Sequence, residues 1–337
     1  MSALTCLELL LRRLGSLPAQ LDAALASFDV SLPRDAGRVL VTGAGMSEGP
    51  ARLMAALLAE AGQPGAFVPM SEFVTETPPR DGDTLVVFSQ GLSPNARFPL
   101  IHLPSFRHAF LITSVRPDPE APAGDARRAA AEAERNGARV VCVPPEDESG
   151  LLLRVVGPAV AALAGALLAL PHARAQLASV PSLYAEALAA PAEPLFIGGR
   201  SAPIALVASG RYANACHGLA WKLLEGLLLP APPVWDVLQV AHGPLQSFYE
   251  REQIVIALER KDAREGPLLE CLAQTLVPSR HRLLRVPSRS PGALAWFEHD
   301  ARLDALLLAT LRARPIDLAA WPGRRADKFL YALAPAS

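Results

Sequence analysis

The sequence predicts an α/β protein made of two similar halves, each with a mostly parallel sheet covered by helices on both faces. Short apolar strands alternate with helical segments, which is typical of parallel sheets. In each half a strand runs into a glycine turn and then a helix. The equivalent glycines, Gly43 and Gly210, are 167 residues apart, which indicates a tandem duplication rather than a short repeat.

Composition excludes several classes of protein. The 337 residues are 51% apolar, which is enough for two packed cores, and a net charge of -1 without dense Lys/Arg runs argues against a nucleic-acid partner. The four cysteines have no C-x-x-C spacing, so neither a zinc site nor a disulfide framework is expected. These features predict a cytoplasmic protein with reduced thiols and with no metal or other cofactor.

One apolar run, Leu151 to Leu170, has nearly the length of a membrane span. Arg154 and the Gly157-Pro158 pair interrupt it, so it fits a buried helix better. The N-terminus also lacks the order of charged, apolar and small residues that defines a signal peptide. We therefore expect no membrane partner.

The first half begins with residues 1–37, where leucines at three- and four-residue steps predict two helices separated by Gly15 and Pro18. Residues 38–170 form the first predicted domain, with strands at 39–41, 83–88, 109–115 and 138–143. Its first glycine turn, Gly43-x-Gly45, is not a dinucleotide-binding motif, because Glu48 stands where the last glycine of G-x-G-x-x-G belongs. Nicotinamide binding is rejected on this ground.

A polar segment, Ser89-Gln90-Gly91-Leu92-Ser93, follows the second of these strands. Hydroxyl, amide and backbone N–H groups at one strand end can donate to a phosphate without a metal. The alternative is an ordinary polar loop.

The second half contains a connection at 171–194, a second predicted domain at 195–313 and a C-terminal tail at 314–337. Strands are predicted at 204–207, 253–258 and 281–286. Between the first two, Lys222 and Glu225 share one face of a helix, and His242 lies in a His-Gly-Pro turn. A lysine and a glutamate at this spacing are also compatible with a plain surface ion pair.

The segments from Ala220 to Glu225 and from His242 to Pro244 resemble the A-L-K-L-K-E and H-G-P motifs of a known domain. That domain is the second sugar isomerase (SIS) domain of the isomerase half of glucosamine-6-phosphate synthase. The two loops of the first half, from Gly43 to Ser47 and from Ser89 to Ser93, resemble the phosphosugar loops of the first SIS domain. The resemblance implies two tandem SIS domains, each a mostly parallel five-stranded sheet in a flavodoxin-like three-layer sandwich, and it implies a homodimer.

The resemblance further implies a phosphosugar aldose–ketose isomerase or an amino-sugar phosphate deaminase or deglycase. Glu225 would be the proton-transfer base, kept ionised by Lys222, and His242 would open the sugar ring. Lys328, near the C-terminus, matches a lysine that forms a Schiff base with an open-chain ketose. The phosphate- or sugar-binding residues would be Ser47, Ser89, Gln90, Gly91 and Ser93.

Three departures from the family pattern keep a second hypothesis open. A serine is missing between Gln90 and Gly91, Met46 replaces a threonine, and Gly218 replaces a glutamate. The alternative is therefore a non-catalytic protein that binds a sugar phosphate and regulates a partner. In either case the glutamine-hydrolysing domain of the synthase is not expected, so synthesis from glutamine is not expected either.

Overall fold

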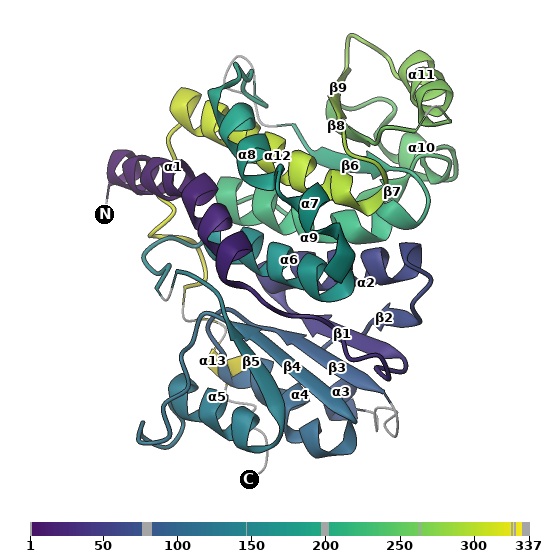
Figure 1. Ribbon diagram of the computed structural model, residues 1–337. Helices are drawn as coiled ribbons and strands as arrows, with labels where there is room; N and C mark the ends of the chain where they lie inside the picture. The colour runs from purple at the N-terminus through teal and green to yellow at the C-terminus, as the bar shows by residue number, and fades with distance from the viewer. Residues whose placement is uncertain are drawn as a thin grey trace. The chain divides into compact units, whose positions relative to one another are not determined.

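The structure is a computed structural model that describes residues 2–75, 83–145, 147–196, 202–262, 264–324, 326 and 328–331. The chain divides into two compact units (Figure 1). The first-sheet unit comprises Ala19–Ser179 and Ala320–Ser337, and the second-sheet unit comprises Met1–Pro18 and Val180–Ala319.

Helix α1 (Ala3–Ser27) runs without a break through Gly15 and Pro18. The expectation of two helices here is wrong. A proline inside a helix costs about 3 kcal/mol, but a buried leucine stripe continues past Pro18 at three- and four-residue steps and holds the helix together. The stripe consists of Leu10, Leu14, Leu17 and Leu21.

The first sheet has five parallel strands in the order β2-β1-β3-β4-β5. They are β1 (Val39–Gly43), β2 (Gly65–Phe67), β3 (Thr84–Phe88), β4 (His108–Thr113) and β5 (Ala138–Cys142). Helices α3 (Glu72–Thr75), α4 (Phe98–Ile101) and α5 (Ala126–Arg135) cover one face, and α2 (Glu48–Glu60) and α6 (Val156–Ala169) pack together on the other (Figure 1). This is the expected three-layer sandwich.

The second sheet has four parallel strands among the described residues, in the order β7-β6-β8-β9. They are β6 (Ile204–Ala208), β7 (Val234–Asp236), β8 (Gln253–Glu259) and β9 (His281–Pro287). Helices α10 (Pro244–Phe248) and α11 (Glu265–Thr275) pack on one face, and α8 (Val180–Ala189), α9 (Arg211–Leu227) and α12 (Ala295–Ala313) form the layer on the other. The prediction of two helix-covered parallel sheets is confirmed, with one strand fewer in the second sheet than expected.

The remaining elements are short. They are the 3₁₀ turns η1 (Gly45–Ser47), η2 (Pro94–Arg97), η3 (Leu103–Ser105), η4 (Pro171–Ala173), η5 (Gln239–Ala241) and η6 (Gly292–Leu294), and the helices α7 (Arg174–Leu177) and α13 (Lys328–Tyr331).

The apolar run after Leu151 forms α6, which is buried along nearly its whole length in the first-sheet unit. A helix enclosed on all sides reads as apolar all round, as this sequence does. Within the described residues no single helix is long and apolar enough to cross a membrane. Only a pair bent by 116°, Val156–Ala169 with Pro171–Ala189, has that length and composition when taken together.

Strand order also fixes where a ligand can approach. In both sheets the second strand lies on one side of the first, and the later strands lie on the other side. Such a reversal opens a crevice at the carboxyl ends of the two strands that flank it, which is where ligands bind in open α/β sheets. These points are β1/β3 in the first sheet and β6/β8 in the second.

Candidate functional site

Two loops meet at the carboxyl edge of the first sheet. One follows β1 and contains η1, and the other, Ser89–Ser93, follows β3. The N–H of Gln90 donates to the hydroxyl oxygen of Ser47 at 3.4 Å. Gly43 permits this approach, because a Cβ atom there would lie 2.4 Å from the Ser47 carbonyl oxygen. The loops that the sequence analysis assigned to phosphate binding are therefore neighbours at the β1/β3 crevice.

The loop after β3 is shaped by its own contacts. Leu92 has a φ of 44°, a left-handed conformation that is unfavourable for a residue with a side chain. Its N–H donates to the Ser89 hydroxyl at 3.2 Å, Arg97 donates to its carbonyl at 2.8 Å, and its side chain is fully buried. The Ser93 hydroxyl donates to the Asn95 side-chain oxygen at 2.8 Å. The loop conformation is therefore fixed without a ligand.

Several donors in these loops make no hydrogen bond to another described residue. They are the hydroxyl protons of Ser47 and Ser89 and the backbone N–H groups of Gly91 and Ser93. The buried side-chain oxygen of Ser114, after β4, also has no protein partner within the described chain. A buried polar atom in that state costs about 1–3 kcal/mol, so this edge retains unused hydrogen-bonding capacity.

Gln90 is held by Glu148. The Gln90 amide nitrogen donates to Glu148 Oε2 at 3.0 Å, and this fixes the amide orientation because a carboxylate only accepts. The other carboxylate contacts are the backbone N–H groups of Val155, Val156 and Gly157 at 2.7–3.0 Å, at the start of α6. Glu148 thus caps α6 and joins it to the loop after β3.

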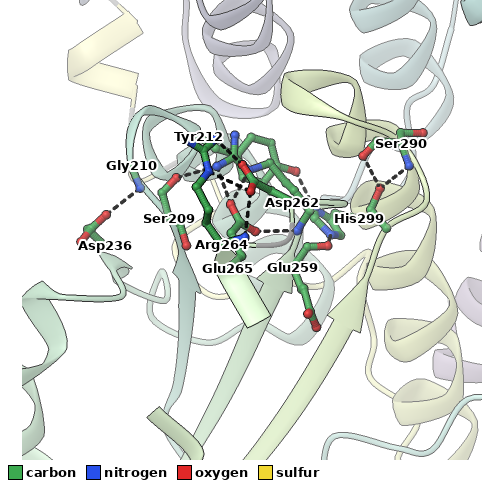
Figure 2. Close-up of polar contacts among 12 residues, drawn as sticks. Ser209, Gly210, Tyr212, Asp236, Glu259, Asp262, Arg264, Glu265, Ser290 and His299 are labelled. Atoms are coloured by element: carbon green, nitrogen blue, oxygen red, sulfur yellow. Dashed lines mark hydrogen bonds and ion pairs between the residues drawn. The ribbon is translucent and has the colours of Figure 1, made fainter. Parts of the chain in front are cut away.

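At the equivalent edge of the second sheet, polar groups bond to side chains of the same unit. Gly210 has a φ of 60°, and its N–H donates to Asp236 Oδ2 at 2.6 Å (Figure 2). A carboxylate from the end of β7 therefore lies at the N-terminal end of α9, where an anionic ligand would otherwise bind. Arg260 forms an ion pair with Glu265 and lies over the Tyr212 ring.

A buried tyrosine–histidine pair lies behind this edge (Figure 2). Tyr212 donates to His299 Nδ1, and His299 Nε2 lies 3.0 Å from the Val286 carbonyl oxygen. The ring nitrogen facing a carbonyl must hold the proton, so neutral His299 accepts from Tyr212. Burial lowers the pKa of His299 to about 4 and raises the pKa of Tyr212 well above its ordinary value. Both groups stay uncharged near neutral pH.

Lys222 belongs to a second buried network. Its Nζ lies 2.7 Å from Asp300 and 2.8 Å from Asp304, and Tyr184 donates to the other Asp300 oxygen at 2.7 Å. Burial alone would lower the pKa of Lys222, but the two carboxylates outweigh it and raise the pKa above its ordinary value. The network joins α9 to α12 and α8.

The sequence analysis paired Lys222 with Glu225, and that pairing is wrong. Among the described residues the Lys222 ammonium forms ion pairs with the two aspartates of α12. Glu225 is half-buried one turn further along α9. A lysine at this helical position can turn either along its own helix or across to a neighbour, and here the buried α12 carboxylates attract it.

His242 is exposed after η5, and its backbone N–H donates to the Gln239 carbonyl at 2.8 Å. Gly243 follows with a φ of 119°, which only glycine adopts readily. In the described part of the second-sheet unit, no hydrogen bond joins His242 to Glu225. The structure therefore places the two candidate proton-transfer residues on separate elements of that unit.

Lys328 begins α13, and α13 contacts η2, directly after the loop containing Ser93. The backbone of the expected Schiff-base lysine therefore belongs to the first-sheet unit, close to the candidate phosphate loop. The lysine side chain lies outside the described part of the structure.

Comparison with known proteins identifies the fold. No protein-family model matches the sequence, and no curated protein matches it. Solved structures do match over nearly the whole chain. The C-terminal domain of glucosamine-fructose-6-phosphate aminotransferase from Francisella tularensis has a TM-score of 0.69 at 13% identity, covering 90% of this chain and 95% of that one. The chain has the tandem SIS fold.

Two further structures with this SIS-type fold come from sugar-phosphate enzymes. Tagatose-6-phosphate ketose/aldose isomerase from Escherichia coli has a TM-score of 0.69 at 17% identity, covering 93% of this chain and 95% of that one. Glucosamine-6-phosphate deaminase from Thermotoga maritima has a TM-score of 0.67 at 14% identity, and the match covers 93% of this chain and 97% of that one. At such identities the similarity establishes the fold, and the site of this chain must be argued from its own residues.

Several residues at the carboxyl edges of the two sheets were not expected from the sequence. No role was expected from the sequence for Glu148, Asp236, Arg260 or Ser114. Asp236 is the last residue of its strand, and the other three lie just after a strand or in the loop that follows one, so the tendency of ligands to bind at carboxyl edges could have pointed to them. Their partners could not be read from the sequence, since those partners lie on other elements.

Replacing Lys222 by Met should destabilise the protein by about 3–5 kcal/mol, because it leaves two buried carboxylates without their cation. Urea unfolding measures the loss. The control is Lys261→Met, which changes an exposed lysine of the same unit and should have little effect. A Lys222→Met protein as stable as the wild type would contradict a structural role for the network.

His299 makes stability depend on pH. Because its folded pKa of about 4 lies below the ordinary value of 6.5, the unfolded chain takes up the proton first. Its contribution is present above pH 6.5 and is lost as pH falls to 4, by up to about 3 kcal/mol. The free energy of unfolding, measured in urea at each pH, should therefore fall less steeply over this window for His299→Gln than for the wild type. His172→Gln, at an exposed site, should follow the wild type, and parallel curves for all three proteins would contradict the assignment.

Proposed function

We propose that the protein binds a phosphorylated sugar at the carboxyl edge of the first sheet and acts on it as an isomerase or as an amino-sugar phosphate deaminase or deglycase. The observation that supports this most is the pair of neighbouring loops after β1 and β3, which carry donors that bond to no other described residue. Phosphate oxygens only accept, so a concentration of free N–H and O–H groups favours such a ligand.

The proposed binding residues are those expected from the sequence. Ser47 and Ser89 would donate hydroxyl protons, Gly91 would donate its N–H, and Ser93 would offer its backbone N–H and a hydroxyl oxygen. Gln90 would position the loop through Glu148 as well as contact the sugar. The solved structures with this fold include a ketose/aldose isomerase and a deaminase that are named for 6-phosphosugars, which supports the same substrate class here.

The proposed chemistry moves a proton between adjacent carbons. His242 would protonate the ring oxygen as the ring opens, and Glu225 would remove the proton from one carbon and return it to its neighbour through an enediol. Lys328 would form a Schiff base with a ketose carbonyl, releasing water. Lys222 would support this indirectly, because its buried ion pairs fix the position of α9 and so of Glu225.

A homodimer is part of the proposal. His242 is exposed between two exposed apolar side chains, Leu238 and Tyr249. A partner subunit covering this surface would bury both of them and bring His242 to a site on that subunit. The free cysteines and a phosphosugar substrate favour a cytoplasmic location.

A non-catalytic sugar-phosphate sensor is the second candidate. It is favoured by the internal contacts of Gln90 and Ser93. Such a protein would bind the ligand without exchanging its carbon-bound protons.

Proton NMR in deuterated water distinguishes the two. The protein incubated with fructose 6-phosphate or glucosamine 6-phosphate should exchange the proton at C1 or C2 for deuterium. Exchange should fall by about 100-fold or more in Glu225→Gln, since an amide cannot take the proton. The control is Glu134→Gln, at an exposed site on α5, which should exchange normally. Binding without exchange by the wild type would exclude the enzyme and favour the sensor.

A further inference from the structure

Arg154 has no assigned role and no polar partner among the described residues. It is half-buried, two residues before α6, and its guanidinium forms no hydrogen bond or ion pair with any other described residue. Partly buried cations are normally paired, because removal from water is costly without compensation. An arginine in this state is therefore available to a ligand.

The guanidinium lies against the candidate phosphate loop. A Cβ atom built on Gly91 would be 3.5 Å from Arg154 Nη1 and 3.9 Å from Nη2, which is ordinary contact. Gly91 is also exposed, and its N–H donates to no described residue. It follows Gln90, at the place where the sequence lacks a serine of the related loops. The Arg154 guanidinium therefore lies beside the loop position where related loops carry a serine hydroxyl.

Neighbouring charges do not neutralise Arg154. Two described carboxylates lie near it in sequence. Glu148 accepts from the Gln90 amide and from three N–H groups of α6, and Asp147 accepts from the N–H and hydroxyl of Ser149. Arg97, the other arginine of this loop region, donates to the carbonyl oxygens of Leu92 and Gly124. Arg154 is thus a charged donor that the described loop leaves uncommitted.

We propose that Arg154 binds an oxyanion of the ligand, together with the Gly91 N–H and the hydroxyls of Ser47 and Ser89. The guanidinium offers two parallel donors, which suits a phosphate ester or a carboxylate. It replaces the missing serine with a charged donor, so this site discriminates anionic from neutral sugars more strongly than hydroxyls alone would. The inference rests on the proposed function, because it assumes that the first-sheet edge is the sugar site.

The test is isothermal titration calorimetry with three probes: glucosamine 6-phosphate, unphosphorylated glucosamine and glucuronate. Arg154→Gln should weaken binding of the anionic probes by about 10- to 100-fold, the loss expected for a charged hydrogen bond, and should not weaken binding of glucosamine, which carries no anionic group. Arg154→Lys keeps the charge but not the two parallel donors, so its affinity for the anionic probes should lie between those of the wild type and Arg154→Gln. Arg128→Gln, on the exposed face of α5, should bind as the wild type does. Thermal unfolding of both Arg154 variants should match the wild type, since within the described chain Arg154 has no polar partner to lose.

The outcomes separate the two proposals. Preference for the 6-phosphate that disappears in Arg154→Gln supports both. The same preference retained in Arg154→Gln overturns the role of Arg154 and leaves the proposed function intact. Arg154-dependent binding of glucuronate without binding of the 6-phosphate supports the oxyanion role and overturns the phosphosugar assignment. A wild type that binds none of the probes overturns both.

Discussion

The carboxylate of Glu148 fixes the geometry on which the candidate site depends. It accepts the first N–H groups of α6 and the side-chain amide of Gln90, so a helix on one face of the first sheet is joined to a loop at its carboxyl edge. Gly157 makes this possible, because a Cβ atom there would overlap the Gln90 side chain at 2.0 Å. The same arrangement holds Arg154, just before α6, beside Gly91. The positions of the loop donors therefore depend on one buried carboxylate.

The two sheets share a topology but differ at the edge where ligands bind. At β1/β3 the loop donors remain unused among the described residues. At β6/β8 the equivalent groups are bonded internally, since Asp236 accepts from Gly210 and Glu265 pairs with Arg260. The second sheet instead presents α9, where the Lys222 network fixes the helix that contains Glu225.

The sequence predicted the longer strands, the parallel sheets and the loops at the first edge, because these follow from local apolar patterns and glycine turns. It did not predict the three-residue strands β2 and β7. It failed where long-range contacts decide the outcome. Pro18 did not end α1, since burial of a leucine stripe outweighs the local cost. Lys222 pairs with the buried aspartates of α12 rather than with Glu225. Those aspartates are some eighty residues away in the sequence, so local spacing could not predict the pairing. Arg154 reads in the sequence only as an interruption of an apolar run, and its neighbour Gly91 is known from the fold alone.

The most direct test of the account is a crystal structure of the protein with glucosamine 6-phosphate. The account predicts the phosphate group at the carboxyl edge of the first sheet, within hydrogen-bond distance of the Ser47 and Ser89 hydroxyls and of the Arg154 guanidinium. The sugar ring would extend away from the loop after β3. A phosphate group bound instead at the β6/β8 edge, near Gly210, or elsewhere on the protein would contradict it.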